Sequence, residues 1–358
     1  MSSIGIPDIS AGPGVFDSGS ALPLHLPGPS SFNPVLRDRK ENRVHDTLAA
    51  APARPQTSLR HLIDPRDLDR PLIEDLLQRA LAFETGAIQA DRQDRRLLAA
   101  IFYEPSTRTR FSFEAAMHRL GGQVLTAESA ARASSAAKGE SLEDAVRIIG
   151  GYVDAIVLRH PEIGAAQRAA AVAPVPVINA GDGAGQHPTQ ALLDLYTIRK
   201  EIGRLDNLRV GIVGDLRHGR TARSLALLLS RFNDNQLVLV SPPGLRMGDD
   251  ILEAIDPKTV QQTPDLDWVV PGLDVLYQTR IQAERFDSLE EYERYQGVYV
   301  VTPELMRDLP EHAILMHPLP RVGEIDRRVD ADPRAAYFRQ ARNGLWTRMA
   351  VLDWVLGS

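Results

Sequence analysis

A cluster of hydroxyl and guanidinium side chains is the first feature of the chain that could do chemistry: Ser106, Thr107, Arg108, Thr109 and Arg110. The cluster follows an apolar run and precedes a helical pattern, so it is predicted to open a helix. Free backbone N–H groups and the helix dipole favour an anion there, and hydroxyls and forked guanidiniums suit phosphate oxygens. The competing interpretation is a Ser/Thr helix cap beside solvated arginines. The P-loop pattern G-x-x-x-x-G-K-[ST] does not occur in the chain.

Three further polar segments stand where predicted strands end or a helix begins. Arg159–His160–Pro161 follows a strand, His187–Pro188–Thr189–Gln190 opens a long helix, and His317–Pro318–Leu319–Pro320–Arg321 follows the last strand. Ligands bind beyond the carboxyl ends of strands in open α/β sheets, so these segments are candidate site segments. For His187 taken alone, a helix-capping or core histidine is an equally good interpretation.

The elements that must position these residues are predicted from the spacing of apolar residues. From Ser58 onward, short apolar runs predict buried strands, and apolar residues at helical spacing predict helices. The strands are expected at 97–103, 155–158, 175–178, 210–215, 237–240, 275–277 and 314–316. The helices are expected at 68–77 with a cap at Asp67, at 106–120, at 188–202 and at 333–356. Such alternation is typical of parallel sheets that helices cover on both faces.

Two such series predict an α/β fold with two doubly wound parallel-sheet domains and a terminal helix that packs back on the first. The expected boundaries are 58–200, 201–332 and 333–358. Residues 1–57 hold 5 Gly and 8 Pro, so they are predicted to be a disordered or loosely attached extension. A transit peptide is the alternative, but such peptides are rich in Arg, and the first Arg of this chain is Arg37. A cytoplasmic location is therefore favoured over plastid targeting.

Composition excludes several classes of function. The 358 residues carry a net charge of −6 and include no cysteine, which excludes disulfides, zinc–thiolate sites, iron–sulfur clusters and a thiol nucleophile. No apolar run reaches the ~18 residues of a membrane span, so no membrane partner is expected. The mild acidity argues against general nucleic-acid binding. The pattern Gly211-x-x-Gly214 lacks G-x-G-x-x-G, which favours close strand–helix packing over a dinucleotide site.

Taken together, the four polar segments resemble the motifs of the carbamoyltransferases. The segment that begins at Ser106 is similar to the one with which this family holds carbamoyl phosphate. The segments that begin at Arg159, His187 and His317 follow it in the family's order and spacing. The similarity extends from about Ser58 to the end of the chain, which is all but the extension.

Two segments distinguish the aspartate members of the family from the ornithine members. Ornithine carbamoyltransferases typically carry His-Cys-Leu-Pro and Ser-Met-Gly, whereas this chain has His317–Pro318–Leu319–Pro320–Arg321 and Gln278–Thr279–Arg280–Ile281–Gln282. Aspartate has two carboxylates, and Arg220 and Arg280 supply forked donors that suit them. A surface ion pair is the alternative interpretation of either arginine. The chain thus resembles the aspartate carbamoyltransferases, and residues 135–141 and 330–341 look closest to plant-type chains.

The resemblance implies transfer of the carbamoyl group of carbamoyl phosphate to the amine of L-aspartate, the committed step of de novo pyrimidine (UMP) biosynthesis, with no metal and no cofactor. By resemblance, the catalytic residues are Arg108, Thr109, Arg159, His187 and Lys138. Those that bind carbamoyl phosphate are Ser106, Thr107, Arg108, Thr109, Ser134, Arg159, His187, Gln190, Leu319 and Pro320. Those that bind aspartate are Lys138, Arg159, Arg220, Arg280 and Gln282. Glu104 and Arg285 are implied to pair across the two domains.

The segment Ser134–Ser141 resembles the family's loop that reaches into the active site of a neighbouring subunit. This implies a homotrimer with shared active sites. A regulatory chain or a pathway enzyme is a further possible partner, and no nucleic acid is expected. Ala133 stands where plant-type chains are expected to carry a bulky aromatic residue, which leaves inhibition by a pyrimidine nucleotide open. The competing hypotheses are a carbamoyltransferase for another amino acceptor and an inactive scaffold of a larger pyrimidine-pathway assembly.

Overall fold

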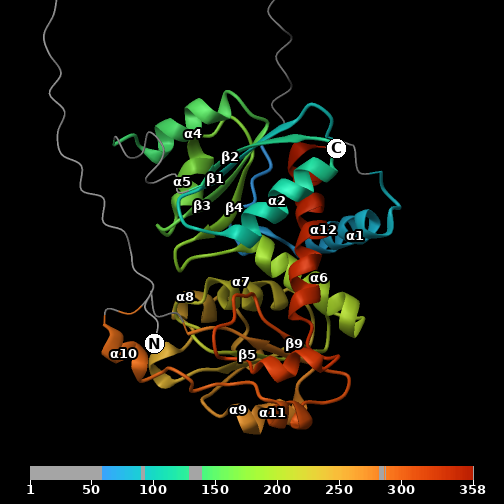
Figure 1. Ribbon diagram of the computed structural model, residues 1–358, viewed down its shortest axis with the longest axis vertical. Helices are drawn as coiled ribbons and strands as arrows, with labels where there is room; N and C mark the ends of the chain where they lie inside the picture. Colours follow the sequence, from blue (N-terminus) through green and yellow to red (C-terminus); the bar gives the residue numbers. More distant parts are fainter. Residues whose placement is uncertain (1–58, 90–92, 129–138, 282–285, 287, 358) are drawn as a thin grey trace, which may run out of the picture. The chain divides into compact units, whose positions relative to one another are not determined.

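The computed structural model describes residues 59–89, 93–128, 139–281, 286 and 288–357 of the chain. The predicted extension, residues 1–57, lies outside the described residues. Strands and helices alternate along the described part (Figure 1). The strands are β1 Leu97–Phe102, β2 Gln123–Glu128, β3 Ala155–His160, β4 Val177–Asp182, β5 Arg209–Val213, β6 Gln236–Val240, β7 Val260–Thr263, β8 Val275–Gln278 and β9 Ile314–Met316. The helices are α1 Arg70–Thr85, α2 Thr107–Arg119, α4 Leu142–Gly150, α5 Ala165–Val172, α6 Pro188–Ile202, α7 Arg220–Leu229, α8 Asp249–Leu252, α9 Leu266–Val269, α10 Leu289–Glu293, α11 Pro303–Asp308 and α12 Tyr337–Leu356.

The described strands form two parallel sheets, as the alternation predicts. The first sheet has the order β2-β1-β3-β4 and the second the order β7-β6-β5-β8-β9. In the first sheet Leu98 pairs with Ala155, and in the second Val210 pairs with Val275. The central strands are buried along almost their whole length because helices cover both faces, which is why they read as apolar runs in the sequence. The predicted fold class is confirmed.

Each sheet reverses its strand order at one place. From β1 the chain moves outward to β2, and from β3 it moves outward the other way to β4, so the carboxyl ends of β1 and β3 border the reversal in the first sheet. In the second sheet the reversal lies between β5 and β8. Crevices for ligands form at such switch points. Glu104 and Arg280 stand in the loops after β1 and β8, Arg159 lies near the end of β3, and Arg220 opens the helix after β5. Strand order alone therefore directs attention to these side chains.

The terminal helix α12 joins the two series. It packs against α1, α2 and α6 and also contacts β9 (Figure 1, red). Its buried side chains include Met349, Leu352 and Val355, which lie at helical spacing on one face. The predicted terminal helix is confirmed, although it begins at Tyr337 rather than near residue 333. The chain just before it is still extended, because Ala335 forms an isolated parallel bridge with Leu315.

Some local predictions were wrong in detail. The first long helix is capped by Asp69, whose carboxylate accepts a 2.9 Å hydrogen bond from the N–H of Leu72, whereas Asp67 ends a short 3₁₀ turn before it. The strands β2 and β7 were not predicted, since both lie at the edge of a sheet and are largely exposed. An edge strand needs no continuous apolar run, so the sequence gives a weak signal there. The strand predicted at 175–178 begins at Val177 and runs on to Asp182.

None of the described helices combines the length and the apolar character that a membrane span requires. Within the same residues, no group of three His, Asp or Glu side chains is arranged to hold a metal ion.

Candidate active site

The predicted anion site lies at the amino-terminal end of α2. Ser106 occupies the cap position, but its side chain makes no capping hydrogen bond, so the simple capping interpretation does not account for its hydroxyl. Thr109 is buried one turn into the helix. The first backbone N–H groups of α2 have no acceptor within the helix, as at every helix start. The residues with these two hydroxyls, and these amides, therefore lie at the helix end where the dipole favours negative charge.

The positive charges of two arginines from different parts of the chain act on one another beside this helix end. Arg108 comes from the first turn of α2 and Arg280 from the loop after β8. Burial, and then the positive charge of Arg280, hold the pKa of the Arg108 guanidinium below its ordinary value. Two guanidiniums that repel one another form a favourable place for an anion, because a bound dianion removes the repulsion. Arg110 differs from Arg108, since its guanidinium is 3.1 Å from Glu128 and 3.4 Å from Glu114.

Glu104, which follows β1, lies between two further arginines. Its Oε2 atom is 3.4 Å from Nε of Arg159 and 3.5 Å from Nη1 of Arg220. Arg159 comes from the end of β3 and Arg220 from the first residue of α7, so the carboxylate holds together groups from both switch points. Arg220 also donates a 2.7 Å hydrogen bond to the carbonyl of Gly183. The sequence predicted a partnership of Glu104 with Arg285, but Arg285 lies outside the described residues.

Gly181 allows these two guanidiniums to come near the end of β4. Its φ of +114° lies in a region that L side chains rarely adopt. A Cβ atom at this position would stand 3.0 Å from Nε of Arg220 and 3.3 Å from Nη1 of Arg159. Any side chain here would displace one or both arginines.

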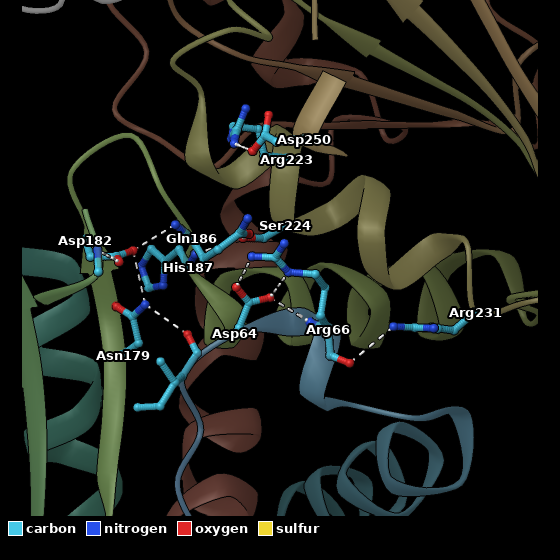
Figure 2. Close-up of polar contacts among 12 residues, drawn as sticks. Asp64, Arg66, Asn179, Asp182, Gln186, His187, Arg223, Ser224, Arg231 and Asp250 are labelled. Atoms are coloured by element: carbon cyan, nitrogen blue, oxygen red, sulfur yellow. Dashed lines mark hydrogen bonds and ion pairs between the residues drawn. The ribbon is translucent and has the colours of Figure 1, made fainter. Parts of the chain in front are cut away.

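His187 lies at the cap position of α6, where a polar network fixes its backbone (Figure 2). Its N–H donates a 2.8 Å hydrogen bond to Oγ of Ser224, which in turn donates to Oε1 of Gln186 at 2.7 Å. The carboxylate of Asp182 accepts hydrogen bonds from the N–H of Gln186 at 2.8 Å and from the side chain of Asn179 at 3.2 Å. Because Ser224 belongs to α7, this network ties the start of α6 to the helix that follows β5 of the second sheet.

The imidazole of His187 is buried but is not used by the network that holds its backbone. Its side chain is among the buried polar groups, and Nδ1 has no hydrogen-bond partner among the described residues. Burial, and then the charges of Arg220, Arg159 and Arg348, hold the pKa of His187 well below its ordinary value. The ring is therefore neutral, and a neutral imidazole still has one N–H to donate. A buried N–H donor beside two guanidiniums is suited to a carbonyl oxygen that gains negative charge.

Gln190 follows His187 by one turn of α6. Its Nε2 atom donates a 2.9 Å hydrogen bond to Oδ1 of Asp194, and both residues are buried. Burial raises the pKa of the Asp194 carboxyl to about 7, against the effect of the hydrogen bonds that it accepts.

The segment that follows β9 is held by a buried histidine. His317 accepts a 2.8 Å hydrogen bond at Nδ1 from the N–H of Leu319, and its Nε2 lies 2.8 Å from a carboxylate oxygen of Glu324. A carboxylate only accepts, so Nε2 carries the proton and Nδ1 is the acceptor. Leu319 has a φ of +54° and is joined to Pro320 by a cis peptide bond. The positive charge of Arg108 contributes to the lowered pKa of His317, so this segment lies near the amino-terminal end of α2.

The structure brings predicted residues from distant parts of the chain together in two groups. Electrostatic contacts connect Arg108 with Arg280 and His317, and connect His187 with Arg159 and Arg220. The predicted residues Ser134, Lys138 and Gln282 lie outside the described residues, as does Ala133.

Sequence reasoning missed several residues that hold the site. These are Ser224, Gly181, Asp194, Tyr277 and Gln340. Asp194 carried a usable signal, because it stands four residues after Gln190 on a predicted helix and so shares its face. The others belong to different elements, and no local pattern connects them with the motifs.

Comparison with known families agrees with this geometry. The family model described as the aspartate/ornithine carbamoyltransferase carbamoyl-P binding domain matches residues 60–200, and the model of the Asp/Orn binding domain of the same family matches residues 206–355. The chain belongs to the aspartate/ornithine carbamoyltransferase family. The four motifs that suggested this resemblance all lie within the matched residues.

Individual relatives agree on the aspartate branch. The chain is 48% identical to the chloroplastic aspartate carbamoyltransferase of Arabidopsis thaliana, over 94% of this chain and 93% of that protein. It is 51% identical to the chloroplastic protein of the same name from Oryza sativa, over 94% and 98%. The solved structure of aspartate transcarbamoylase from Trypanosoma cruzi in complex with carbamoyl phosphate and aspartate is 40% identical with a TM-score of 0.77, over 82% of this chain and 95% of that one. The predicted resemblance to plant-type aspartate carbamoyltransferases is therefore confirmed.

Proposed function

We propose that the chain transfers the carbamoyl group of carbamoyl phosphate to the amine of L-aspartate, giving N-carbamoyl-L-aspartate and phosphate, the committed step of de novo pyrimidine (UMP) biosynthesis. The observation that carries the proposal is the convergence of Arg159 and Arg220 on Glu104. The charges of the same two arginines act on His187, and the charges of Arg108 and Arg280 act on one another. These groups come from the switch points of both sheets. They supply separate positive regions for a phosphate, a polarised carbonyl and a dicarboxylate.

The chemistry needs donors at two places. The amine nitrogen of aspartate forms a bond to the carbonyl carbon, negative charge develops on the carbonyl oxygen, and the carbon–oxygen bond to phosphate then breaks with its electron pair on phosphate. Carbamoyl phosphate is already activated, so positioning and electrostatic stabilisation can supply the acceleration. The described side chains offer donors for both charges without a covalent intermediate.

We assign the phosphate to the amino-terminal end of α2. Ser106, Thr107, Arg108 and Thr109 would hold its oxygens, with Ser134 and Lys138 closing over it. Arg159, His187 and Thr109 would donate to the carbonyl oxygen. Gln190 and the backbone carbonyls of Leu319 and Pro320 would accept from the carbamoyl NH₂ group.

We assign the carboxylates of aspartate to Arg220 and Arg280, with Gln282, Arg159 and Lys138 as further contacts. The second sheet supplies Arg220 and Arg280, so residues 201–332 would form the aspartate-binding domain and residues 58–200 the carbamoyl-phosphate-binding domain. Residues 333–358 would be the helix that returns to the first domain. The assignment predicts that Arg280→Ala raises the KM for aspartate far more than the KM for carbamoyl phosphate.

An assay with the purified protein tests the proposed reaction directly. Formation of carbamoylated product is measured from carbamoyl phosphate with L-aspartate and, in parallel, with L-ornithine. Activity with aspartate alone supports the proposal. Activity with ornithine would contradict the roles of Arg220 and Arg280, and a folded protein that is inactive with both would favour the scaffold hypothesis.

We also propose a homotrimer with shared active sites, in which Ser134 and Lys138 serve the neighbouring subunit. Light scattering on the purified chain measures the oligomeric state. The sharing is tested by mixing two inactive variants, Lys138→Ala and Arg108→Ala, under conditions that exchange subunits. Recovered activity supports the shared site, because some sites then combine an intact Lys138 with an intact Arg108. Mixtures that stay inactive although the subunits exchange would contradict it.

The compartment and the regulation need separate tests. The prediction of a cytoplasmic location rests on the composition of residues 1–36, whereas the plant relatives are named chloroplastic, which favours the plastid alternative. Expression in plant cells of residues 1–57 fused to a fluorescent protein distinguishes the two locations. Pull-down of the full chain tests for a regulatory chain or a pathway enzyme, and initial rates with added UMP test for inhibition.

A further inference from the structure

A buried polar network ties Gln190 to three residues that have no assigned part in the reaction. Oδ1 of Asp194 accepts a 2.9 Å hydrogen bond from Nε2 of Gln190 and a 2.7 Å hydrogen bond from Nε2 of Gln340, and Oδ2 accepts a 2.7 Å hydrogen bond from the hydroxyl of Tyr277. Asp194 is fully buried, and Gln340 is nearly so. Three elements, α6, β8 and α12, therefore meet at one carboxylate.

The hydrogen bonds of the two glutamines in this network have a direction that chemistry fixes. Gln340 accepts a 2.8 Å hydrogen bond at Oε1 from the backbone N–H of His317, which can only donate. The side-chain amide of Gln340 must then direct its NH₂ group toward Asp194. The Oδ1 atom of Asp194 accepts from both glutamines, so Gln190 must also direct its NH₂ group inward.

The protonation state of Asp194 does not alter this direction. Its pKa is raised to about 7 by burial, so part of the population carries a proton at neutral pH. Because Oδ1 already accepts two N–H groups, the proton resides on Oδ2, which faces the hydroxyl of Tyr277. Oδ1 is an acceptor in both states.

The network therefore decides which atom of Gln190 remains for a ligand. The NH₂ group of Gln190 donates to Asp194 and also forms a hydrogen bond with the hydroxyl of Tyr277, so the carbonyl oxygen is the end of the amide that remains. Oε1 of Gln190 accepts no hydrogen bond from a described residue. A ligand with an N–H or O–H group at this position would satisfy it.

We propose that Asp194 and Gln340 are positioning residues that select the NH₂ group of the carbamoyl donor by locking the Gln190 amide with its oxygen toward the substrate. The inference rests on the proposed function, because it assigns the carbamoyl group to Gln190. Gln340 also accepts the hydrogen bond from the N–H of His317, two residues before Leu319. One network therefore orients the side-chain oxygen of Gln190 and anchors the segment that carries the backbone carbonyls of Leu319 and Pro320.

Acetyl phosphate provides the test, because it carries a methyl group where carbamoyl phosphate carries NH₂. Dissociation constants of both compounds are measured by titration calorimetry for the wild-type protein and its variants. The wild-type protein is expected to prefer carbamoyl phosphate. The Asp194→Ala variant is expected to lose about tenfold of that preference, while its affinity for acetyl phosphate changes much less. A residue that merely stabilised the fold would weaken both compounds equally, and that result would overturn the proposal.

Three further variants sharpen the result. The Asp194→Asn variant can keep its oxygen toward both glutamines and turn its NH₂ group toward Tyr277, so it is expected to restore most of the preference. The Asn343→Ala variant removes a buried 3.0 Å hydrogen bond between the same two helices, from Nδ2 of Asn343 to Oγ1 of Thr197, and is the matched control that should keep the preference. In the Gln190→Ala background, Asp194→Ala should cause no additional loss of preference. An additive loss in that double variant, or a loss in Asp194→Asn as large as in Asp194→Ala, would contradict the proposal.

The outcomes separate this inference from the proposed function. Wild-type protein that binds neither compound, or binds both equally, would contradict the assignment of carbamoyl phosphate itself. A wild-type preference that survives in Asp194→Ala would contradict only the role of Asp194. If Asp194→Ala does not fold, Asp194→Ser is measured in the same way, since its shorter side chain cannot reach both glutamine amides.

Discussion

Replacement of Arg108 by alanine tests the anion site most directly. One guanidinium that makes two charge-assisted hydrogen bonds to a phosphate contributes about 1.5–3 kcal/mol for each bond. The variant also loses the relief of the repulsion between Arg108 and Arg280 that a bound dianion provides, so two such bonds set a lower bound of about 3 kcal/mol. The net loss of transition-state stabilisation is then about 3–4 kcal/mol, which corresponds to roughly a 100- to 1,000-fold fall in kcat/KM.

The control for this prediction lies on the same helix turn. Arg110 is already paired with Glu114 and Glu128, and its guanidinium stacks on the ring of Phe111. The Arg110→Ala variant should therefore lose about 1 kcal/mol of stability but keep its activity within about threefold. Arg108→Lys keeps the charge and loses the fork, so an intermediate loss is expected.

The assay is the initial rate of carbamoyl aspartate formation at varied carbamoyl phosphate, with circular dichroism and thermal melting as checks of folding. If Arg108→Ala were folded and lost less than about tenfold in kcat/KM, the phosphate would not bind at this guanidinium. If Arg110→Ala lost as much kcat/KM as Arg108→Ala, the effect would come from the helix end as a whole. The prediction that the ion pairs of Arg110 keep it from contacting the phosphate would then be refuted.

Three further predictions concern the groups around His187. The pKa of His187 lies well below its ordinary value of 6.5 in the folded protein, so only the unfolded chain gains a proton as the pH falls through 6.5, and stability that is present above this pH is lost below it. The free energy of unfolding, measured by urea denaturation, should therefore fall between pH 7.5 and 5.5 by about 1.4 kcal/mol less in His187→Gln than in the wild type. An equal fall in both would mean that the ring is protonated in the folded protein. Ser224→Ala removes the acceptor of the His187 N–H and should cost about 1–2 kcal/mol together with a fall in kcat, whereas unchanged denaturation and rates would show that the network does not matter. Gly181→Ala should displace Arg220 and raise the KM for aspartate at least tenfold, with full activity as the contrary result.

The sequence by itself determined the local elements and the chemical types at their ends. Apolar periodicity depends only on neighbouring residues, so it predicted α6 and β9 with the bounds that the structure has, and it predicted an anion site at the start of α2. The same reasoning failed at β2 and β7, because edge strands lack the two-sided burial that produces an apolar run. The motifs, read as a resemblance, led to the family that the comparisons then established.

Only the tertiary structure decided which side chains meet. Strand order sets the two switch points, and no local pattern encodes it, so the pairing of Glu104 with both Arg159 and Arg220 could not be derived from the chain alone. Asp194 likewise meets a tyrosine 83 residues away and a glutamine 146 residues away. The physical reason is that burial makes these polar groups satisfy one another wherever the chain brings them together, and such long-range pairing leaves no periodic signal in the sequence.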